Sequence, residues 1–170
     1  MTRRLIILGA CALAFALTTA AQEIYTNDEA DYAFELPNAT WRAVPRAEGA
    51  TTNVEFIYGD RSDGLLRIRK EIVDAGVKPA DVSERDRDTK LRQRHQSSFV
   101  DGRTEPFPGR LNGVASSYEY TQGGKPMAGR VYYLQADPRT VYVLHFTGSR
   151  PILLRARSQT DFIARSFRIK

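Results

Sequence analysis

Residues 114–148, VASSYEYTQGGKPMAGRVYYLQADPRTVYVLHFTG, decide the fold of this chain. They contain three runs rich in apolar residues and tyrosine, 114–121, 127–135 and 140–148, which are joined by two short segments containing glycine or proline. Links of this length and composition are typical of hairpin turns. The stretch therefore predicts three consecutive antiparallel strands.

A further hairpin is expected nearer the N-terminus. Residues 53–58 alternate polar and apolar side chains, and residues 65–73 do so again after a polar turn with a glycine at each end. Alternation with a period of two is expected of a strand that buries one face. In the second strand we expect two faces, an inward one with Leu66, Ile68 and Ile72 and an opposite one with Arg67, Arg69 and Glu71.

The segments on either side of this hairpin are less regular. Residues 31–37, DYAFELP, alternate in the same way and predict a strand, which Pro37 ends because proline cannot donate to a ladder. Trp41 is expected in the loop that follows, with its side chain buried over one end of the core. Residues 99–113 contain three glycines and two prolines and predict a loop, with a short edge strand at 105–107.

Two helices are expected beside the sheet. Residues 79–96 are rich in helix-compatible residues and begin with a proline, which suits a first turn. Their apolar stripe is thin, with Val82 and Leu91 as its large members, so this helix should lie mostly in water. Residues 151–167 form the stronger helix, because an apolar stripe at intervals of three or four residues can dock on a sheet. That stripe consists of Leu153, Ala156, Thr160, Ile163 and Phe167.

These elements predict one α+β domain in which an antiparallel sheet of about six strands is flanked by two helices, an α/β/α sandwich. Two signatures, YAFELP at 32–37 with Trp41 close behind and IARSF at 163–167, resemble the PsbP/DcrB-like superfamily. That superfamily consists of exported proteins, including the photosystem II subunit PsbP and bacterial relatives of unknown role. The resemblance implies a sheet sandwiched between helices, and it carries over no metal, cofactor or partner residue.

The N-terminus has the three parts of a secretory signal peptide. Arg3 and Arg4 precede an apolar run at 5–17, and small residues follow. A membrane-spanning helix needs about 20 apolar residues, so we expect cleavage after residue 21, no stable membrane insertion, and a mature domain at 22–170. The protein is then periplasmic or secreted. The sequence around Cys11 matches a lipoprotein box, but apolar residues continue after the cysteine, so we expect no lipidation.

Charge and motifs narrow the function classes. The 25 Lys and Arg residues exceed the 20 Asp and Glu residues, but the signs are interspersed, and nucleic-acid binders cluster their charge. We expect no nucleic-acid partner, metal or cofactor, because no nucleophile elbow, zinc-ligand cluster or phosphate loop occurs. The only histidines are His95, interpreted as surface, and His145, interpreted as a packed or surface-facing strand residue. The sequence thus favours a protein that is not an enzyme.

Tyrosines are the one feature that points to a binding surface, because they are enriched at interfaces. Both ordinary sheet packing and a partner or ligand surface remain open for them. The first hypothesis is an exported accessory or binding protein of the cell envelope that contacts another protein. The alternative is a carrier of a small apolar or aromatic ligand between sheet and helix, which a tyrosine-lined pocket larger than ~300 Å³ would favour. The candidate residues are Tyr118, Tyr120, Tyr132, Tyr133 and Tyr142.

Overall fold

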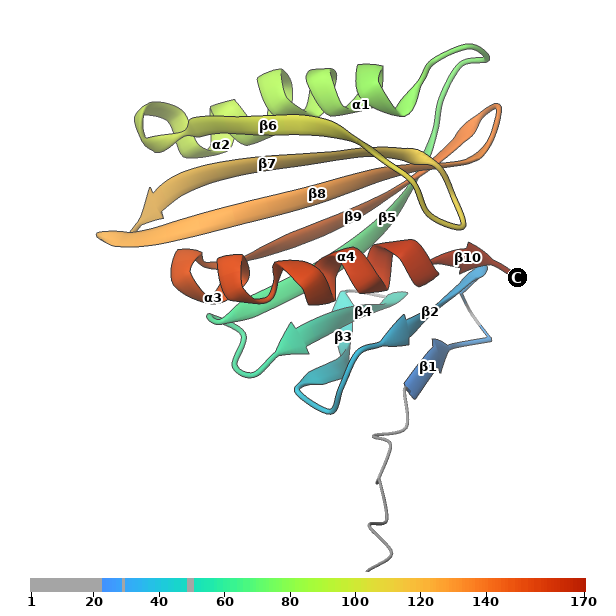
Figure 1. The fold of residues 1–170 in the computed structure, drawn as a ribbon, viewed down its shortest axis with the longest axis horizontal. Helices are drawn as coiled ribbons and strands as arrows, with labels where there is room; N and C mark the ends of the chain where they lie inside the picture. Colours follow the sequence, from blue (N-terminus) through green and yellow to red (C-terminus); the bar gives the residue numbers. More distant parts are fainter. Residues whose placement is uncertain (1–22, 29, 49–50) are drawn as a thin grey trace, which may run out of the picture.

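The computed structural model describes residues 23–28, 30–48 and 51–170 (Figure 1). The predicted signal peptide, residues 1–21, and its Cys11 lie outside these residues. Within the described ranges, no helix has both the length and the apolar character needed to cross a bilayer.

The described strands form two antiparallel sheets. The large one has seven strands in the order β3-β4-β5-β9-β8-β7-β6, one more than the six expected, and the small one has the order β1-β2-β10. The predicted meander is confirmed, since β7, β8 and β9 pair consecutively. The strands are β1 (Glu23–Thr26), β2 (Tyr32–Leu36), β3 (Trp41–Glu48), β4 (Thr51–Tyr58), β5 (Gly64–Ile72), β6 (Val100–Phe107), β7 (Gly113–Gln122), β8 (Lys125–Asp137), β9 (Thr140–Ser149) and β10 (Arg168–Ile169).

The helices cover opposite faces of the large sheet. Two of them, α3 (Arg150–Arg155) and α4 (Arg157–Ser166), cross the front of the sheet in Figure 1. On the other face α1 (Pro79–Asp86) continues through the π-helical turn η1 (Arg87–Leu91), α2 (Arg92–His95) and the 3₁₀ turn η2 (Gln96–Ser98). This arrangement confirms the α/β/α sandwich. We call the two sides of the sheet the α1 face and the α4 face.

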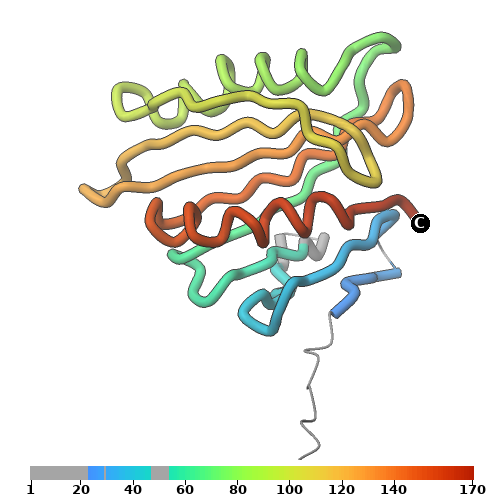
Figure 2. Tube along the Cα trace, viewed as in Figure 1, coloured from blue at the N-terminus to red at the C-terminus, as the bar shows by residue number. Residues whose placement is uncertain are grey.

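Each face has its own apolar core, because side chains alternate along every strand. On the α4 face, Tyr132 and Leu144 pack with Ile163 of α4 and Phe34 of β2. The small sheet lies on this side, and its strand β10 brings the C-terminus beside β2 (Figure 2). On the α1 face, the core includes Val82, Leu91, Val131, Tyr133, Val141 and Val143.

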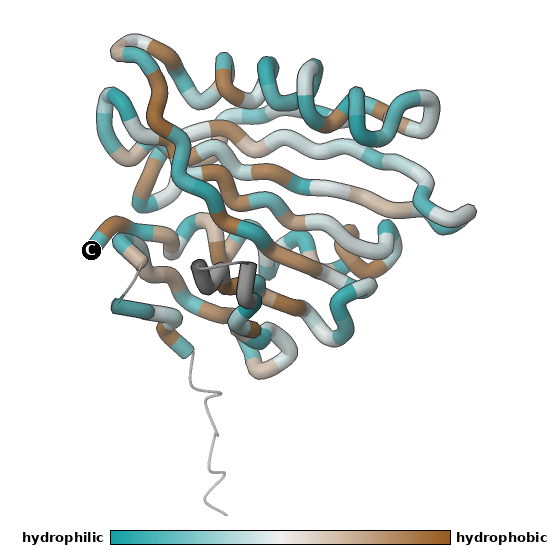
Figure 3. The backbone as a smooth tube through the Cα atoms, turned by 180° about the vertical axis from the view of Figure 1, so that it is seen from behind, coloured by the Kyte–Doolittle hydropathy of each residue, from teal (hydrophilic) through white to brown (hydrophobic). Residues whose placement is uncertain are grey.

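Both predicted helices bury the side chains expected of them. Val82 is fully buried and Leu91 nearly so, whereas most of the surrounding helix is hydrophilic (Figure 3). All five members of the C-terminal stripe are buried. The helix itself is broken at Ala156, and Phe167 lies just past its end in extended backbone.

Three expectations are wrong in detail. Trp41 is buried as expected, but it begins β3 instead of lying in a loop, and its indole Nε1 donates to Gln159 Oε1 at 2.9 Å. Residues 100–107 form a full edge strand, β6, where a loop with a short edge strand at 105–107 was expected. Its side chains are almost all exposed, so the sequence shows no apolar alternation there. Ile72 is 64% exposed instead of inward, because it lies at the end of β5 beyond both cores.

Candidate functional site

A cavity of about 680 Å³ opens on the α1 face of the large sheet. Its floor is made by β5, β8 and β9, and one wall is made by the helical segment α1–η1–α2. On the far side it reaches β3 and β4, and residues of β1, of β2 and of the segment that joins them. The cavity therefore lies between sheet and helix.

The cavity exists because the large sheet splits. β4 pairs with β5 only from Phe56 to Tyr58, opposite Gly64 to Leu66, whereas β5 stays paired with β9 as far as Ile72. The first half of β4 and the second half of β5 are therefore not neighbours in the ladder. The cavity follows this split, with Glu55 on its β4 side and Arg67 on its β5 side.

Two rows of paired residues form the cavity floor. In the first row Arg67 pairs with His145, which pairs with Val131. In the second row Arg69 pairs with Val143, which pairs with Tyr133. Each row thus places an arginine beside apolar or aromatic side chains that face α1.

His145 is the histidine of the floor, and it is held neutral. Burial of the imidazole, assisted by the positive charges of Arg94 and Arg69, lowers the pKa of His145 to about 3. The hydroxyl of Tyr118 lies 2.7 Å from Nε2 of this ring, and burial raises the pKa of that hydroxyl. An imidazole with a pKa this low is uncharged near neutral pH and is a weak base there.

The carboxylates around the cavity are held by basic side chains. Glu55 is buried and contacts Arg46 and Arg67 through Oε1, each at 3.0 Å, and Arg61 through Oε2 at 2.5 Å. Burial opposes its ionisation, but the hydrogen bonds from Arg67 and Arg46 outweigh that effect and lower the pKa of Glu55. Glu55 is therefore an ionised carboxylate, clamped in the sheet split.

A second acidic group lies where α1 meets β5. Asp86 is buried and contacts Arg69, and its Oδ1 lies 2.7 Å from Nζ of Lys90. Glu71, just outside the cavity lining, contacts Arg69 at 2.8 Å, Arg85, and Lys90 at 4.0 Å. These two acidic side chains thus share Arg69 and Lys90, and Arg85 contacts Glu71 alone.

Arg94 completes the basic side chains of the cavity wall. It lies on α2, four residues after Lys90, and lines the cavity. Among the residues that the structure describes, no carboxylate lies within 4 Å of its guanidinium. Its charge nevertheless reaches the floor, because it helps to lower the pKa of His145.

The five predicted tyrosines do not lie on one face. Tyr132 and Tyr142 belong to the core of the α4 face, whereas Tyr118, Tyr120 and Tyr133 belong to that of the α1 face. All five are at most 7% exposed, and Tyr133 is the one that lines the cavity.

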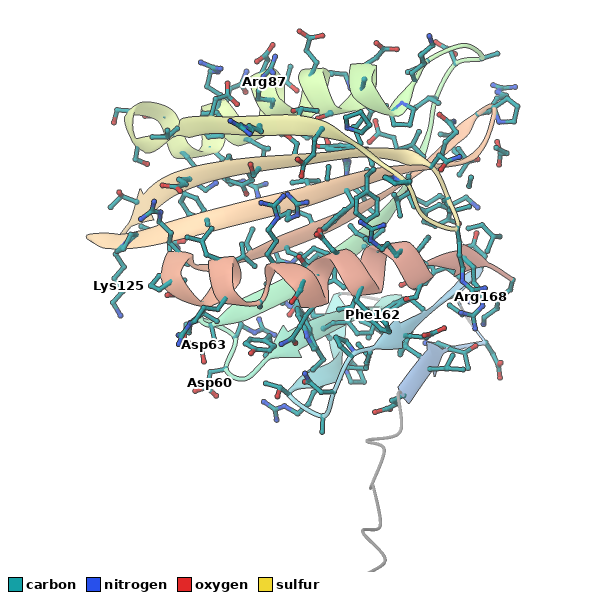
Figure 4. The ribbon with its side chains drawn as sticks, viewed as in Figure 1. Asp60, Asp63, Arg87, Lys125, Phe162 and Arg168 are labelled. Atoms are coloured by element: carbon teal, nitrogen blue, oxygen red, sulfur yellow. The ribbon has the colours of Figure 1, made fainter. Side chains whose placement is uncertain are left out.

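Both histidines contact the tyrosines of the α1 face. His145 is packed, as one interpretation allowed. His95, interpreted as surface, is half-buried with its ring centroid 3.8 Å from that of Tyr120. By contrast Asp60 and Asp63 sit at the periphery, on the turn between β4 and β5 (Figure 4).

The basic wall of the cavity was not predicted from the sequence. Two signals could have indicated it. Asp86, Lys90 and Arg94 are spaced four apart and so share one side of the helix, and Arg67 and Arg69 share one face of β5. What the sequence does not show is that these two groups face one another.

Comparison with known proteins agrees on the fold. No family model and no curated protein matches the chain. Among solved structures, the cyanobacterial PsbP protein CyanoP of Synechocystis superposes with a TM-score of 0.61 at 17% identity, over 96% of this chain and 99% of CyanoP. The predicted PsbP-like α+β fold is therefore confirmed.

Two further solved structures share this architecture. The Ran-binding protein Mog1p of Saccharomyces cerevisiae gives a TM-score of 0.63 at 6% identity, over 89% of this chain and 96% of Mog1p. LpqN of Mycobacterium tuberculosis, which is involved in cell envelope biogenesis, gives 0.51 at 12% identity, over 90% of this chain and 87% of LpqN. At sequence identities this low, the similarity shows a shared fold and nothing about function.

Proposed function

We propose that the chain is an exported, non-enzymatic binding protein of the cell envelope that holds a small ligand in the cavity between β5, β8, β9 and the α1–α2 segment. The observation that carries this proposal is the cavity itself. Its volume of about 680 Å³ falls within the ~300–1,000 Å³ typical of ligand pockets. It lies between sheet and helix and has Tyr133 in its lining, as the carrier hypothesis requires.

The ionisable groups of the cavity favour binding over catalysis. A general base works best with a pKa near the operating pH, and the pKa of His145 is far below that range. Glu55 and Asp86 are each engaged by at least two basic side chains. Among the described residues, no three potential metal ligands come together.

The proposed location rests on two independent observations. The N-terminal 21 residues have the composition of a secretory signal peptide. The fold is shared with LpqN, a protein of cell envelope biogenesis. Both support a role in the envelope.

Native mass spectrometry tests the proposal. The mature protein is incubated with an envelope extract, passed through a desalting column and weighed without denaturation. We expect a bound species of a few hundred daltons.

Leu91 lines the cavity, so Leu91→Trp should fill it and abolish that species. Leu154→Trp is the matched control, because Leu154 is 56% exposed on α3, away from the cavity. Equal loading of both variants would contradict the proposal.

A partner protein is the second candidate. The observation that favours it is β6, the outer strand of the large sheet, whose side chains are mostly exposed, with Val100 at 60%. An exposed edge strand can accept a strand from another chain. Mog1p, which has the same architecture, is a Ran-binding protein. Affinity capture that is lost in a Thr104→Pro variant of β6, but not in Leu91→Trp, would support this candidate.

A further inference from the structure

We infer that the cavity takes a small organic anion, with a carboxylate or phosphate group on an apolar or aromatic body. This inference rests on the proposed function and adds the chemical class of the ligand. It rests on the charged side chains of the cavity wall and on the apolar side chains beside them.

Basic side chains outnumber acidic ones around the cavity. Among the described residues, five basic and three acidic side chains line it, the acidic ones being Asp31, Glu55 and Asp86. Such a surplus in a concave, partly apolar site concentrates anions. The five basic residues are Arg46, Arg67, Arg69, Lys90 and Arg94.

The arginines retain donors for a ligand. A guanidinium has five N–H donors and binds carboxylate or phosphate in a bidentate manner. Arg67 directs Nε and one terminal nitrogen to the same oxygen of Glu55, and its side chain is still 55% exposed. Arg94 has no ion pair with any described carboxylate. An anion between these two arginines would meet donors from both sheet and helix.

An apolar surface lies directly beside these donors. Tyr25, Val54 and Ile68 line the same cavity and are only partly buried, and the buried side chains of Val131, Val143 and Leu91 lie next to them in the lining. A bare inorganic ion would leave this surface unused. A ligand with an apolar or aromatic body would cover it, at about 25 cal/mol per Å² buried.

A titration followed by NMR tests the ligand class. Phenyl phosphate and benzoate are the anionic probes, benzyl alcohol is the neutral body, and inorganic phosphate is the bare anion. We expect phenyl phosphate and benzoate to shift the methyl signals of Val131, Val143 and Leu91 in a saturable manner. Arg94→Gln should weaken both about tenfold, the usual effect of losing one charge-assisted hydrogen bond.

The control is a matched charge change outside the cavity. Arg103 is exposed on β6 and forms no ion pair with a described carboxylate. Arg103→Gln should leave the affinity for both anionic probes unchanged. If both variants lost the same affinity for the anionic probes, the effect would come from the net charge of the protein and not from the cavity, and the inference would be wrong.

The probes separate failure of this inference from failure of the proposed function. If benzyl alcohol bound as tightly as the anionic probes, the ligand would need no negative charge and the inference would be wrong, but the cavity would still be a binding site. If inorganic phosphate bound as tightly as phenyl phosphate, the ligand would need no apolar or aromatic body, and that part of the inference would be wrong. If no probe shifted the cavity methyls at millimolar concentration, the inference would fail, and an unloaded protein in native mass spectrometry would then refute the proposed function separately.

Discussion

The hydroxyl of Tyr118 on β7 reaches over strand β8 to lie 2.7 Å from Nε2 of His145 on β9. Gly129 makes this possible. It is the β8 residue opposite Tyr118 in the ladder, and a Cβ at its position would overlap the Tyr118 ring. The glycine thus lets an aromatic side chain lie flat across a strand and contact a half-buried imidazole.

Gly129→Ala should destabilise the protein by about 1–3 kcal/mol, because the added methyl displaces the Tyr118 ring from a packed position. Urea unfolding measures the free energy. In a Tyr118→Leu background the same substitution should cost much less, since the overlapping ring is gone. A full cost that persisted in that background would show that the ring is not the obstacle.

Stability should fall with pH below neutrality because of His145. Its folded pKa of about 3 lies below its ordinary value of 6.5, so the unfolded chain binds the proton first. The contribution of neutral His145 to the free energy of unfolding is complete above about pH 6.5 and is lost as the pH falls towards 3. At pH 5 the loss is on the order of 2 kcal/mol.

Urea unfolding at pH 7 and pH 5 checks this dependence. His145→Gln should flatten it markedly. His95 also has a pKa lowered by burial, so His95→Gln serves as the comparison and should flatten it less. An unchanged pH dependence in His145→Gln would contradict the neutral, buried assignment.

Phe167→Ala should cost far more stability than Leu91→Ala. Phe167 is fully buried, with its ring 5.2 Å from those of both Tyr32 and Tyr142, and truncation leaves a sealed void at a cost of about 3–5 kcal/mol. Leu91 borders the open cavity, so its truncation only enlarges an existing space. Chemical denaturation of the two variants should reveal this order, and the reverse order would contradict it.

Export should yield a mature chain that starts at Gln22 and carries no lipid. The apolar run ends in small residues that suit a signal peptidase, and it continues past Cys11. The intact mass of protein recovered from the envelope gives the first residue directly. A mass that corresponds to an acylated Cys11 would contradict cleavage after residue 21.

The sheet was predictable where strands form long apolar runs or alternate apolar with polar residues. Strands β7, β8 and β9 are long runs joined by short turns, and β2 has the alternation of a half-buried strand. Strand β6 was not predictable, because hydrophobic alternation reports burial and β6 is exposed along almost its whole length. Its pairing with β7 depends on backbone hydrogen bonds, to which the identity of the side chains contributes little.

The candidate site was less predictable than the fold. Tyrosine-rich strands indicated a binding surface, but strand alternation sends Tyr132 and Tyr133 to opposite faces, and only Tyr133 reaches the cavity. The basic side chains meet through the angle at which α1 crosses the sheet and through the point where β4 leaves β5. Both are tertiary features, and neither has a local sequence pattern.

The split between β4 and β5 has a consequence for selectivity. Beyond the pairing of Phe56 with Leu66, the ladder between these strands ends, and the ion pair of Glu55 with Arg67 spans the split. Long side chains adjust more readily than a ladder does, so this side of the cavity can widen without breaking the sheet. On the proposed function, the protein should therefore tolerate ligands of different length and discriminate among them by where their charge lies.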